Sequence, residues 1–354
     1  MLFPETISKK LGISYPVIQA PMFGVSTPEM VAASADAGCL GSLALGDLPA
    51  EQCISLIRKT RSLTGRLFAV NIFVHEIPEI TAELREKYAK AKAYIEAFAE
   101  DNGLSVSLTA LEDLTTNSYH EQIEAIIDEG CEILSFTFGI PDEKSIVRLK
   151  EKNVLLIGTC TSVTEAQMLE KAGIDLIVVQ GIEAGGHRGT FATESLPQIG
   201  GMSLLPQIAD HVDTALIYSG GIYNAQTMQA AKALGAEGFQ LGSMLLASQE
   251  SALQPFEKDR LKMVSENDIV LTRTFSGRYA RGISNKYIRK LEGSGFILPY
   301  PYQNKLTGAL RNAAKLRQDT DFVSIWLGQS IHDYSRQSVK DILGKLIDDY
   351  SRLP

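Results

Sequence analysis

The sequence contains little cysteine, and its arrangement excludes the common cysteine motifs. The 354 residues include four cysteines, Cys39, Cys53, Cys131 and Cys160. No two of them form a C-x-x-C pair, which argues against a zinc or redox motif. Each lies in or beside an apolar run, where a free thiol behaves as a small hydrophobic group. We therefore expect reduced thiols and a cytoplasmic protein.

Long hydrophobic runs and an excess of basic charge are also absent. No apolar run approaches the roughly 18 residues that span a bilayer, and the N-terminal stretch MLFPETISKKLG lacks the apolar core of a signal peptide. We expect a soluble protein with no membrane partner.

Lys and Arg total 34 against 42 Asp and Glu, a formal net charge of −8. Binding to nucleic acid needs a basic surface, so a nucleic-acid partner is not expected either. A local basic pocket for an anionic small molecule remains compatible with this balance.

A recurring unit of helix, glycine and apolar strand is the most informative pattern that is present. In four places a helical pattern ends at a glycine, at Gly38, Gly130, Gly173 and Gly235, where a left-handed helix cap is favoured. A short apolar run without alternation follows each, as in strands buried on both faces. This pattern is typical of a parallel α/β protein.

The number of strand candidates points to a closed barrel. The candidates are residues 16–21, 40–45, 67–73, 132–138, 154–160, 175–181, 215–221 and 238–242. Eight strand–helix units predict a (β/α)₈ TIM-type barrel. An open doubly wound sheet is the competitor, but it would carry G-x-G-x-x-G after its first strand, and the segment APMFGVST lacks it.

Two segments exceed what a barrel requires. Residues 75–125 are charged and mostly helical, and residues 250–318 contain clustered Tyr, Arg, Gly and Pro. We predict a cofactor-binding barrel over residues 1–249 that is completed by a C-terminal helix within 319–354. Residues 250–318 are predicted to form an inserted lid or substrate subdomain over the strand ends.

Polar or glycine-rich groups follow seven of the candidate strands. In a barrel, these strand ends meet at the face that holds the active site. The groups are Gln19–Met22, Asn71, Thr137, Thr159–Thr161, Gln180–Gly189, Ser219–Gly221 and Gln240–Ser243. Their common position predicts a ligand site.

The densest of these groups is QGIEAGGHRG, residues 180–189. Gly185 and Gly186 lack a Cβ atom, so the backbone could approach a flat ligand closely. His187 follows them, and a loop histidine can act as a general base near neutral pH. A flexible loop with a solvated histidine is the alternative, but the neighbouring strand ends favour the catalytic interpretation.

The last two strand ends suggest a phosphate site. Ser219–Gly221 and Gln240–Ser243 occupy the positions from which barrels often bind phosphate through backbone N–H groups. Simple turn geometry is the alternative for each glycine alone. Two adjacent loops favour a phosphate-bearing cofactor.

Basic and tyrosine side chains gather in the second insertion. They are Arg273, Arg278, Arg281, Lys286, Tyr300, Tyr302 and Lys305. A solvated surface is the ordinary explanation of such a cluster, and contact with an anionic substrate is the functional one. The remaining histidines show no metal-ligand spacing, so no metal is expected. By residue type alone, Met22 and Trp326 are assigned to packing.

Taken together, the motifs resemble the nitronate monooxygenase family, formerly called 2-nitropropane dioxygenases, which are FMN-dependent barrels. The segments that carry the resemblance are QAPMFGVSTPEMVAASADAGCLGSLALG, QGIEAGGHRGTF, YSGGI, GAEGFQLGSMLLASQES and TRTFSGRYARGISN, and it extends over nearly the whole chain. The resemblance implies His187 as the catalytic residue. It implies FMN contacts from Gln19, Ala20, Pro21, Met22, Asn71, Gln180, Gly185, Gly186, Gly220, Gly221, Gln240, Leu241, Gly242 and Ser243.

The implied reaction is the oxidation of an alkyl nitronate, of the propionate 3-nitronate type, by O₂. Its products are a carbonyl compound and nitrite or nitrate. Thr137, Tyr300, Tyr302 and Lys305 are the candidate contacts with this small anionic substrate. Thr137 stands where family members often have a second active-site histidine, and Ser243 where threonine is common.

Two other functions fit parts of the sequence. An FMN-dependent enoyl-ACP reductase that uses NAD(P)H shares the barrel and a similar EAGGH loop. The segments TRTFSGRYARGISN and WLGQS favour the monooxygenases over it. A non-catalytic flavin-binding barrel is the second alternative, and the intact His187 argues against it. The sequence predicts no particular oligomeric state.

Overall fold

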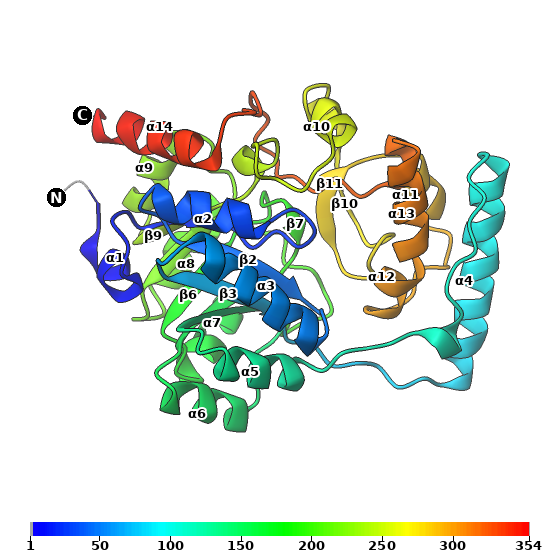
Figure 1. Ribbon diagram of the computed structural model, residues 1–354, viewed down its shortest axis with the longest axis horizontal. Helices are drawn as coiled ribbons and strands as arrows, with labels where there is room; N and C mark the ends of the chain where they lie inside the picture. Colours follow the sequence, from blue (N-terminus) through cyan, green and yellow to red (C-terminus); the bar gives the residue numbers. More distant parts are fainter. Residues whose placement is uncertain (1–2, 354) are drawn as a thin grey trace.

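Eight short parallel strands form a barrel in the computed structural model, which describes residues 3–353 (Figure 1). The strands run in the order β1-β9-β8-β6-β5-β4-β3-β2. Their bounds are β1 (Val17–Gln19), β2 (Gly41–Gly46), β3 (Phe68–Phe73), β4 (Ile133–Thr137), β5 (Leu155–Cys160), β6 (Leu176–Gln180), β8 (Leu216–Ser219) and β9 (Gly238–Leu241). The predicted TIM-type barrel is confirmed.

The first strand closes the barrel. The Gln19 N–H donates to the Leu40 carbonyl and the Leu40 N–H to the Val17 carbonyl, both at 2.9 Å. On its other side β1 pairs with β9. The sheet therefore has no open edge, as closure of a barrel requires.

The strands lack alternation because both of their faces are buried. Every residue of β2 and β3 is buried. One face packs inside the barrel, where Ile18, Leu40 and Ile217 belong to one apolar cluster. Helix α1 (Glu5–Leu11) contributes Ile7 and Leu11 to the same cluster. Two-sided burial of this kind produces continuous apolar runs in parallel strands.

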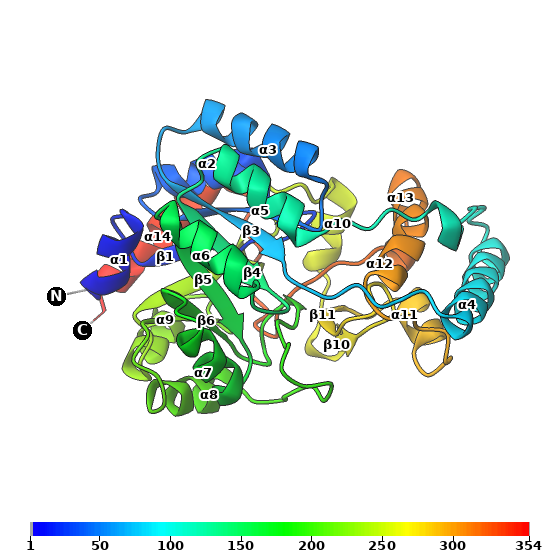
Figure 2. The same cartoon turned by 90° about the horizontal axis from the view of Figure 1, so that it is seen from below.

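A ring of helices covers the outside of the barrel (Figures 1 and 2). They are α2 (Pro28–Asp36), α3 (Ala50–Leu63), α5 (Tyr119–Asp128), α6 (Glu143–Glu151), α7 (Val163–Lys171), α8 (Gly201–Ala209), α9 (Ala225–Ala233) and α14 (Val339–Ser351). The four glycines predicted as left-handed caps all have positive φ, between 60° and 110°. Helix α14 packs against α2 and α9. Within residues 3–353, no helix is both long and apolar enough to cross a membrane.

The remaining elements form a second body at one end of the barrel. In both ribbon views, α4 (Ala82–Asp101) lies beside α11 (Lys286–Leu291) and α13 (Gly308–Leu316), at the end away from the chain termini (Figures 1 and 2). The other elements there are η1 (Leu111–Asp113), α10 (Pro255–Leu261), η3 (Glu266–Asp268), β10 (Ile269–Thr272), β11 (Ala280–Ile283), α12 (Tyr302–Leu306) and η4 (Thr320–Phe322).

Aromatic contacts join the first insertion to the second insertion and to the segment that follows it. The rings of Tyr94 and Phe296 lie 4.8 Å apart, and those of Phe98 and Phe322 lie 5.6 Å apart. The Tyr302 hydroxyl donates to the Pro78 carbonyl at 2.5 Å. Residues around α4, which the sequence placed within the barrel segment 1–249, therefore pack against the insertion 250–318. The predicted domain boundaries themselves stay a prediction.

A small antiparallel sheet connects this second body to the barrel. Its order is β10-β11-β7, where β7 (Gly186–His187) belongs to the loop after β6. Ala280 pairs with His187 and Arg281 with Gly186. The Arg188 N–H adds a hydrogen bond to the Tyr279 carbonyl at 2.8 Å. The second insertion therefore holds the histidine loop through backbone hydrogen bonds.

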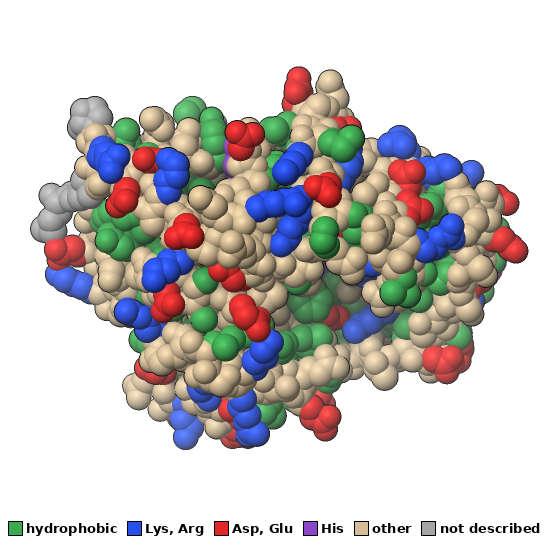
Figure 3. Space-filling model, turned by 45° about the horizontal axis from the view of Figure 1, so that its top comes forward, with side chains coloured by type: hydrophobic (Ala, Val, Ile, Leu, Met, Phe, Trp, Pro, Cys, Tyr) green, Lys and Arg blue, Asp and Glu red, His purple; other side chains and the backbone are tan. Residues whose placement is uncertain are grey.

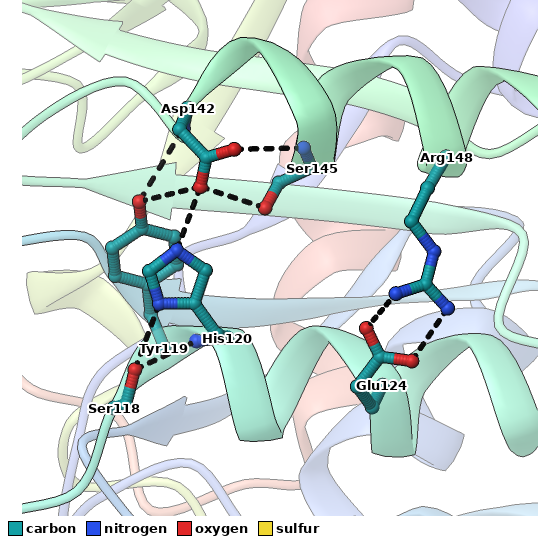
Figure 4. A network of polar contacts seen from close by, with 7 residues as sticks. All are labelled: Ser118, Tyr119, His120, Glu124, Asp142, Ser145 and Arg148. Carbon is teal, nitrogen blue, oxygen red and sulfur yellow. Dashed lines mark hydrogen bonds and ion pairs between the residues drawn. The ribbon is translucent and has the colours of Figure 1, made fainter.

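Far from this connection, a polar network ties α5 to α6 (Figure 4). Asp142 caps α6 by accepting from the Ser145 N–H at 3.0 Å, and its other oxygen accepts from the Tyr119 hydroxyl at 3.0 Å and lies 2.7 Å from His120 Nε2. Partial burial raises the pKa of Asp142. The hydrogen bonds from Ser145, His120 and Tyr119 together outweigh this effect and hold the pKa well below its ordinary value.

Replacing Asp142 by alanine should lower the free energy of unfolding by about 1 kcal/mol, the usual effect of losing an N-cap. Since the folded-state pKa is depressed, the charge stabilises the protein above the unfolded value and this contribution is lost as the pH falls below about 4. Urea unfolding at pH 7 and pH 3.5 measures both effects. Asp142→Asn keeps an oxygen that can cap the helix, so it should lower the free energy of unfolding by less than Asp142→Ala. Equal unfolding midpoints for wild type and Asp142→Ala would contradict the assignment.

Candidate active site

A cavity of about 460 Å³ lies at the carboxyl ends of the barrel strands, where the second insertion meets the barrel. Its walls come from most strand-end loops and from the second insertion. The predicted site residues that line it are Ala20, Pro21, Met22, Asn71, Thr137, Gln180, Gly185, Gly186, His187, Gly220, Gly221, Gln240, Gly242, Ser243 and Tyr300. The fold thus brings residues from distant parts of the sequence to one cavity.

Four of the predicted site residues lie outside the cavity wall. Gln19 is fully buried, and its side chain binds the Ser26 hydroxyl and the Ser42 N–H. Leu241 is buried in the hydrophobic core. Tyr302 is turned toward the Pro78 carbonyl, and Lys305 Nζ pairs with Asp47 at 3.3 Å. These side chains pack or bind within the protein, and the cofactor and substrate contacts predicted for them stay predictions.

The basic side chains singled out in the second insertion also lie elsewhere. The guanidinium of Arg273 stacks on the Tyr279 ring at 5.1 Å, and that of Arg278 on the Phe138 ring at 4.3 Å. Arg281 donates through Nε to the Ile182 carbonyl at 3.0 Å, and Lys286 donates to the Asn102 side chain. None of the four lines the cavity that holds His187. Arg273 and Arg278 line a different cavity, and substrate contact by any of the four stays a prediction.

The ring of His187 is oriented by Ser276. His187 Nε2 lies 2.8 Å from Ser276 Oγ, and the Ser276 hydroxyl donates to the Arg278 carbonyl at 3.0 Å. Since that hydroxyl has only one proton, Oγ must accept from the ring, and this network assigns the imidazole proton to Nε2. Within residues 3–353, Nδ1 has no hydrogen-bond partner, so its lone pair remains available.

The surroundings of His187 keep the imidazole neutral. Burial lowers the pKa of His187 to about 4, and the charges of Arg278 and Arg311 act in the same direction, against Asp47. The rings of Phe138 and Trp326 lie 5.6 Å and 5.7 Å from it. A general base must be unprotonated at the working pH. His187 meets this condition at neutral pH.

The side chains of Gln180 and Glu165 hold the loop that carries His187. Gln180, at the end of β6, donates to the His187 carbonyl at 3.0 Å and accepts from the Gly189 N–H at 2.9 Å. Glu165, in the first turn of α7, accepts from the N–H groups of Phe191 and Ala192 at 2.6 Å and 3.0 Å. A buried carboxylate with several N–H donors is well satisfied. No sequence pattern marked Glu165, since its partners lie 26 and 27 residues away.

The last two strand-end loops offer free backbone donors. Gly220 and Gly221 adopt positive φ angles of 121° and 71°. In the described part of the chain, their N–H groups and that of Ser243 have no hydrogen-bond acceptor. All three residues line the cavity. Grouped backbone N–H donors of this kind bind phosphate, so this end of the cavity fits the phosphate of a nucleotide cofactor.

Comparison with known proteins agrees with this geometry. The sequence model of the nitronate monooxygenase family matches residues 5–349. A probable nitronate monooxygenase of Staphylococcus aureus (strain JH9) is 38% identical over 351 residues, which cover 98% of this chain and 97% of the relative. The chain belongs to the nitronate monooxygenase family. It is therefore an oxidoreductase, of a family of flavin enzymes.

Solved structures related to this nitronate monooxygenase family member have the same fold. A nitroalkane oxidase from Streptomyces ansochromogenes superimposes with a TM-score of 0.88 at 33% identity, over 98% of both chains. FabK from Thermotoga maritima superimposes with a TM-score of 0.75 at 26% identity, over 98% of this chain and 95% of its own.

Several cavity residues of this family member were not found from the sequence. Ser276, Asn304 and Arg311 come from the second insertion, and His332 from the segment before α14. Trp326, which the sequence assigned to packing, also lines the cavity. The sequence analysis searched for site residues directly after the barrel strands. None of these residues follows a barrel strand, so that search could not find them. The polar motif around Ser276 was the one available signal.

The structure explains why this family member has glycine at both positions of the EAGGH motif. A Cβ on Gly185 would lie 2.5 Å from the Gly328 nitrogen and closer still to the Leu327 carbonyl carbon. Gly185 is therefore required by the backbone of the WLGQS segment, whatever ligand binds. Gly186 has a φ of 72° with open space around its Cβ position. Its positive backbone angle, and not a lack of space, therefore favours glycine at this position.

Gly185→Ala should lower the free energy of unfolding by about 1–3 kcal/mol, because two backbone segments must separate. Gly344→Ala is the control. Gly344 lies inside α14 with nothing within 4 Å of its Cβ position, so alanine there should stabilise the protein by about 0.5–1 kcal/mol. Thermal unfolding measures both variants. An unchanged melting temperature for Gly185→Ala would show that the 327–328 segment moves freely.

Proposed function

We propose that this protein is an FMN-dependent nitronate monooxygenase that oxidises small alkyl nitronates, of the propionate 3-nitronate type, with O₂. The products are a carbonyl compound and nitrite or nitrate. The observation that carries the proposal is a neutral His187 with a free Nδ1 in the same cavity as the unpaired N–H groups of Gly220, Gly221 and Ser243. Family membership and the likeness to a nitroalkane oxidase support it.

The cofactor in this proposal is FMN. The backbone N–H groups of Gly220, Gly221 and Ser243 would hold its single phosphate. Residues Ala20–Met22 and Asn71 line the same cavity and would contact the ring system. When bound, the flavin would supply the electron-transfer chemistry between the substrate and O₂. The sequence carries no G-x-G-x-x-G for the adenylate half of a dinucleotide, which favours FMN over FAD.

In this proposal His187 handles the proton of a neutral nitroalkane. Its Nδ1 takes the α-proton, and the electron pair of the broken C–H bond moves into the nitro group to give the nitronate. Ser276 keeps the ring in the required tautomer through Nε2. A nitronate that enters as an anion has already lost this proton. For it, His187 would position the substrate.

A flavin-dependent enoyl reductase is the second candidate. The superposition with FabK at 26% identity favours it to some degree, but the family model and the nitroalkane oxidase at 33% identity favour nitronate oxidation more strongly. Consumption of NAD(P)H by the purified protein, measured with and without a nitronate, distinguishes the two candidates.

Mass spectrometry of the flavin released by heat should identify FMN. Gly220→Asp should reduce the flavin content of the purified protein at least tenfold, because a carboxylate would face the phosphate. Gly220→Ala is the matched control for backbone strain, since residue 220 has a φ of 121°, and it should retain more flavin than the aspartate variant. Released FAD, or equal flavin loss in both variants, would contradict the phosphate assignment.

His187→Asn should slow turnover of neutral nitroalkanes by about 10²-fold or more, since general-base catalysis contributes 10²–10⁴-fold. Turnover of preformed nitronates should fall much less. Since the pKa of His187 is about 4, wild-type kcat/KM for a nitroalkane should be flat from pH 5 to 8 and should fall only as the pH drops toward 4 and the base becomes protonated. Steady-state oxygen consumption measures both substrates. Equal losses on the two would show that His187 does not act as the base.

A further inference from the structure

A second cavity, of about 410 Å³, departs from the charge balance of the rest of the protein. The formal net charge is −8, and on the face shown in Figure 3 blue and red side chains are interspersed over both parts of the molecule. Among residues 3–353, the wall of this cavity carries three arginines, Arg188, Arg273 and Arg278, and one acid, Glu194. A cavity lined mainly by charge of one sign attracts the opposite charge.

This second cavity is separate from the cavity that holds His187, because the two share no lining residue. One side of the second cavity is the chain that follows His187, from Arg188 to Leu196, and the other is the turn before β11, from Arg273 to Tyr279. The β7–β11 pairing and the bond from the Arg188 N–H to the Tyr279 carbonyl hold these two segments side by side. The second cavity therefore lies between two segments that also carry His187 and Ser276.

The guanidinium of Arg278 is fixed in the wall and keeps an unused donor. It lies over the Phe138 ring at 4.3 Å, and its Nη1 donates to the Thr190 carbonyl at 3.2 Å. Among residues 3–353, no acceptor occurs for its Nη2 or for its buried Nε. A polar group without a partner is costly when it is shielded from water. Nη2 is thus the donor that Arg278 can offer to a ligand.

The other two arginines of the wall differ in exposure. Arg273 is exposed and stacks on the Tyr279 ring at 5.1 Å, and its guanidinium donates no hydrogen bond within the described part of the chain. Arg188 is 2% exposed, and its two amino groups donate to the carbonyls of Gln180, at 2.9 Å, and Gly181. Burial lowers the pKa of Arg188 to about 10, so this side chain is still charged at neutral pH. Arg188 therefore adds fixed positive charge, and Arg273 adds a free guanidinium.

The size and the apolar part of the wall restrict the kind of anion that fits. Guanidinium groups bind phosphate oxygens through paired hydrogen bonds. A volume of about 410 Å³ lies in the range of small-molecule sites and exceeds what a bare phosphate ion would fill. Phe191, Leu196 and Tyr279 give the wall apolar and aromatic surface, against which a flat ring can pack. These features fit a phosphate group that is joined to a ring-bearing molecule.

We propose that this second cavity binds a nucleoside monophosphate, whose phosphate is held by Arg273 and Arg278 and whose rings pack on the apolar part of the wall. The site goes beyond the proposed nitronate oxidation and does not depend on it, since the cavity of His187 has other lining residues. A ligand bound there would connect the turn that carries Ser276 to the chain after His187. It should therefore stabilise the folded protein against heat.

Calorimetric titration of the flavin-loaded wild-type protein with AMP, adenosine and inorganic phosphate tests the proposal. AMP should bind once per chain, leave the flavin absorbance unchanged and raise the melting temperature. Adenosine lacks the phosphate and inorganic phosphate lacks the rings, so each should bind more weakly than AMP by about tenfold or more. Failure of AMP to bind, equal binding of either comparison ligand, or release of flavin by AMP would each overturn the proposal.

Substitutions on the wall locate the bound AMP. Arg273→Gln removes one charged hydrogen bond and should weaken AMP binding by about tenfold. Glu194→Gln removes the acid of the wall and should tighten AMP binding by about two- to fivefold. Arg66→Gln is the matched control, because Arg66 is an exposed arginine that precedes β3 and so lies at the opposite, amino ends of the barrel strands. This control should bind AMP as the wild type does.

Two further results would overturn the site. One is an unchanged AMP affinity in Arg273→Gln. The other is an equal loss in Arg273→Gln and Arg66→Gln, which would show that AMP responds only to the net charge of the protein. Arg273→Lys retains the charge but loses the planar guanidinium, so it should recover part of the affinity. Since the Arg273 side chain is exposed, these variants should fold, and thermal melting without AMP checks this.

Discussion

The backbone pairing between β7 and β11 is the constraint on which the rest of the site depends. It joins a loop at the end of the sixth barrel strand to a segment almost 100 residues later, through the partners His187–Ala280 and Gly186–Arg281. This pairing brings Ser276 against the His187 ring and seats α12 and α13 over the strand ends. Without it, the barrel would retain its core but the cavity would lose one wall and the orientation of its base.

The polar groups around the cavity divide into those satisfied by the protein and those left for a ligand. Gln180, Glu165, Lys305 and Lys315 are fully engaged with backbone groups or counter-ions. Among residues 3–353, no partner occurs for His187 Nδ1, for Arg311 Nη1 or for the N–H groups of Gly220 and Gly221. Because a buried polar group without a partner is costly, the unsatisfied set is the better guide to what binds.

This division also explains why a motif can be specific to a family and still have a structural purpose. In EAGGH, Gly185 makes room for the backbone at Leu327–Gly328, and the Glu183 carboxylate accepts from the Gly201 N–H at 3.0 Å. Only His187 in this motif presents a reactive atom. The other residues of the motif make structural contacts that position the His187 side chain in the cavity.

The sequence by itself determined the barrel and the strand-end part of the site. Apolar runs buried on both faces and glycines at helix ends are local signals, and the carboxyl ends of parallel strands must meet at one face, so His187, Gly220 and Gly221 could be placed together. It did not determine which cations face the cavity. Arg278 and Lys305 stood close to the motifs yet turn to Phe138 and Asp47, whereas Arg311 had no motif beside it. The direction of a long flexible side chain depends on partners that are distant in the sequence, and only the tertiary structure brings those partners together.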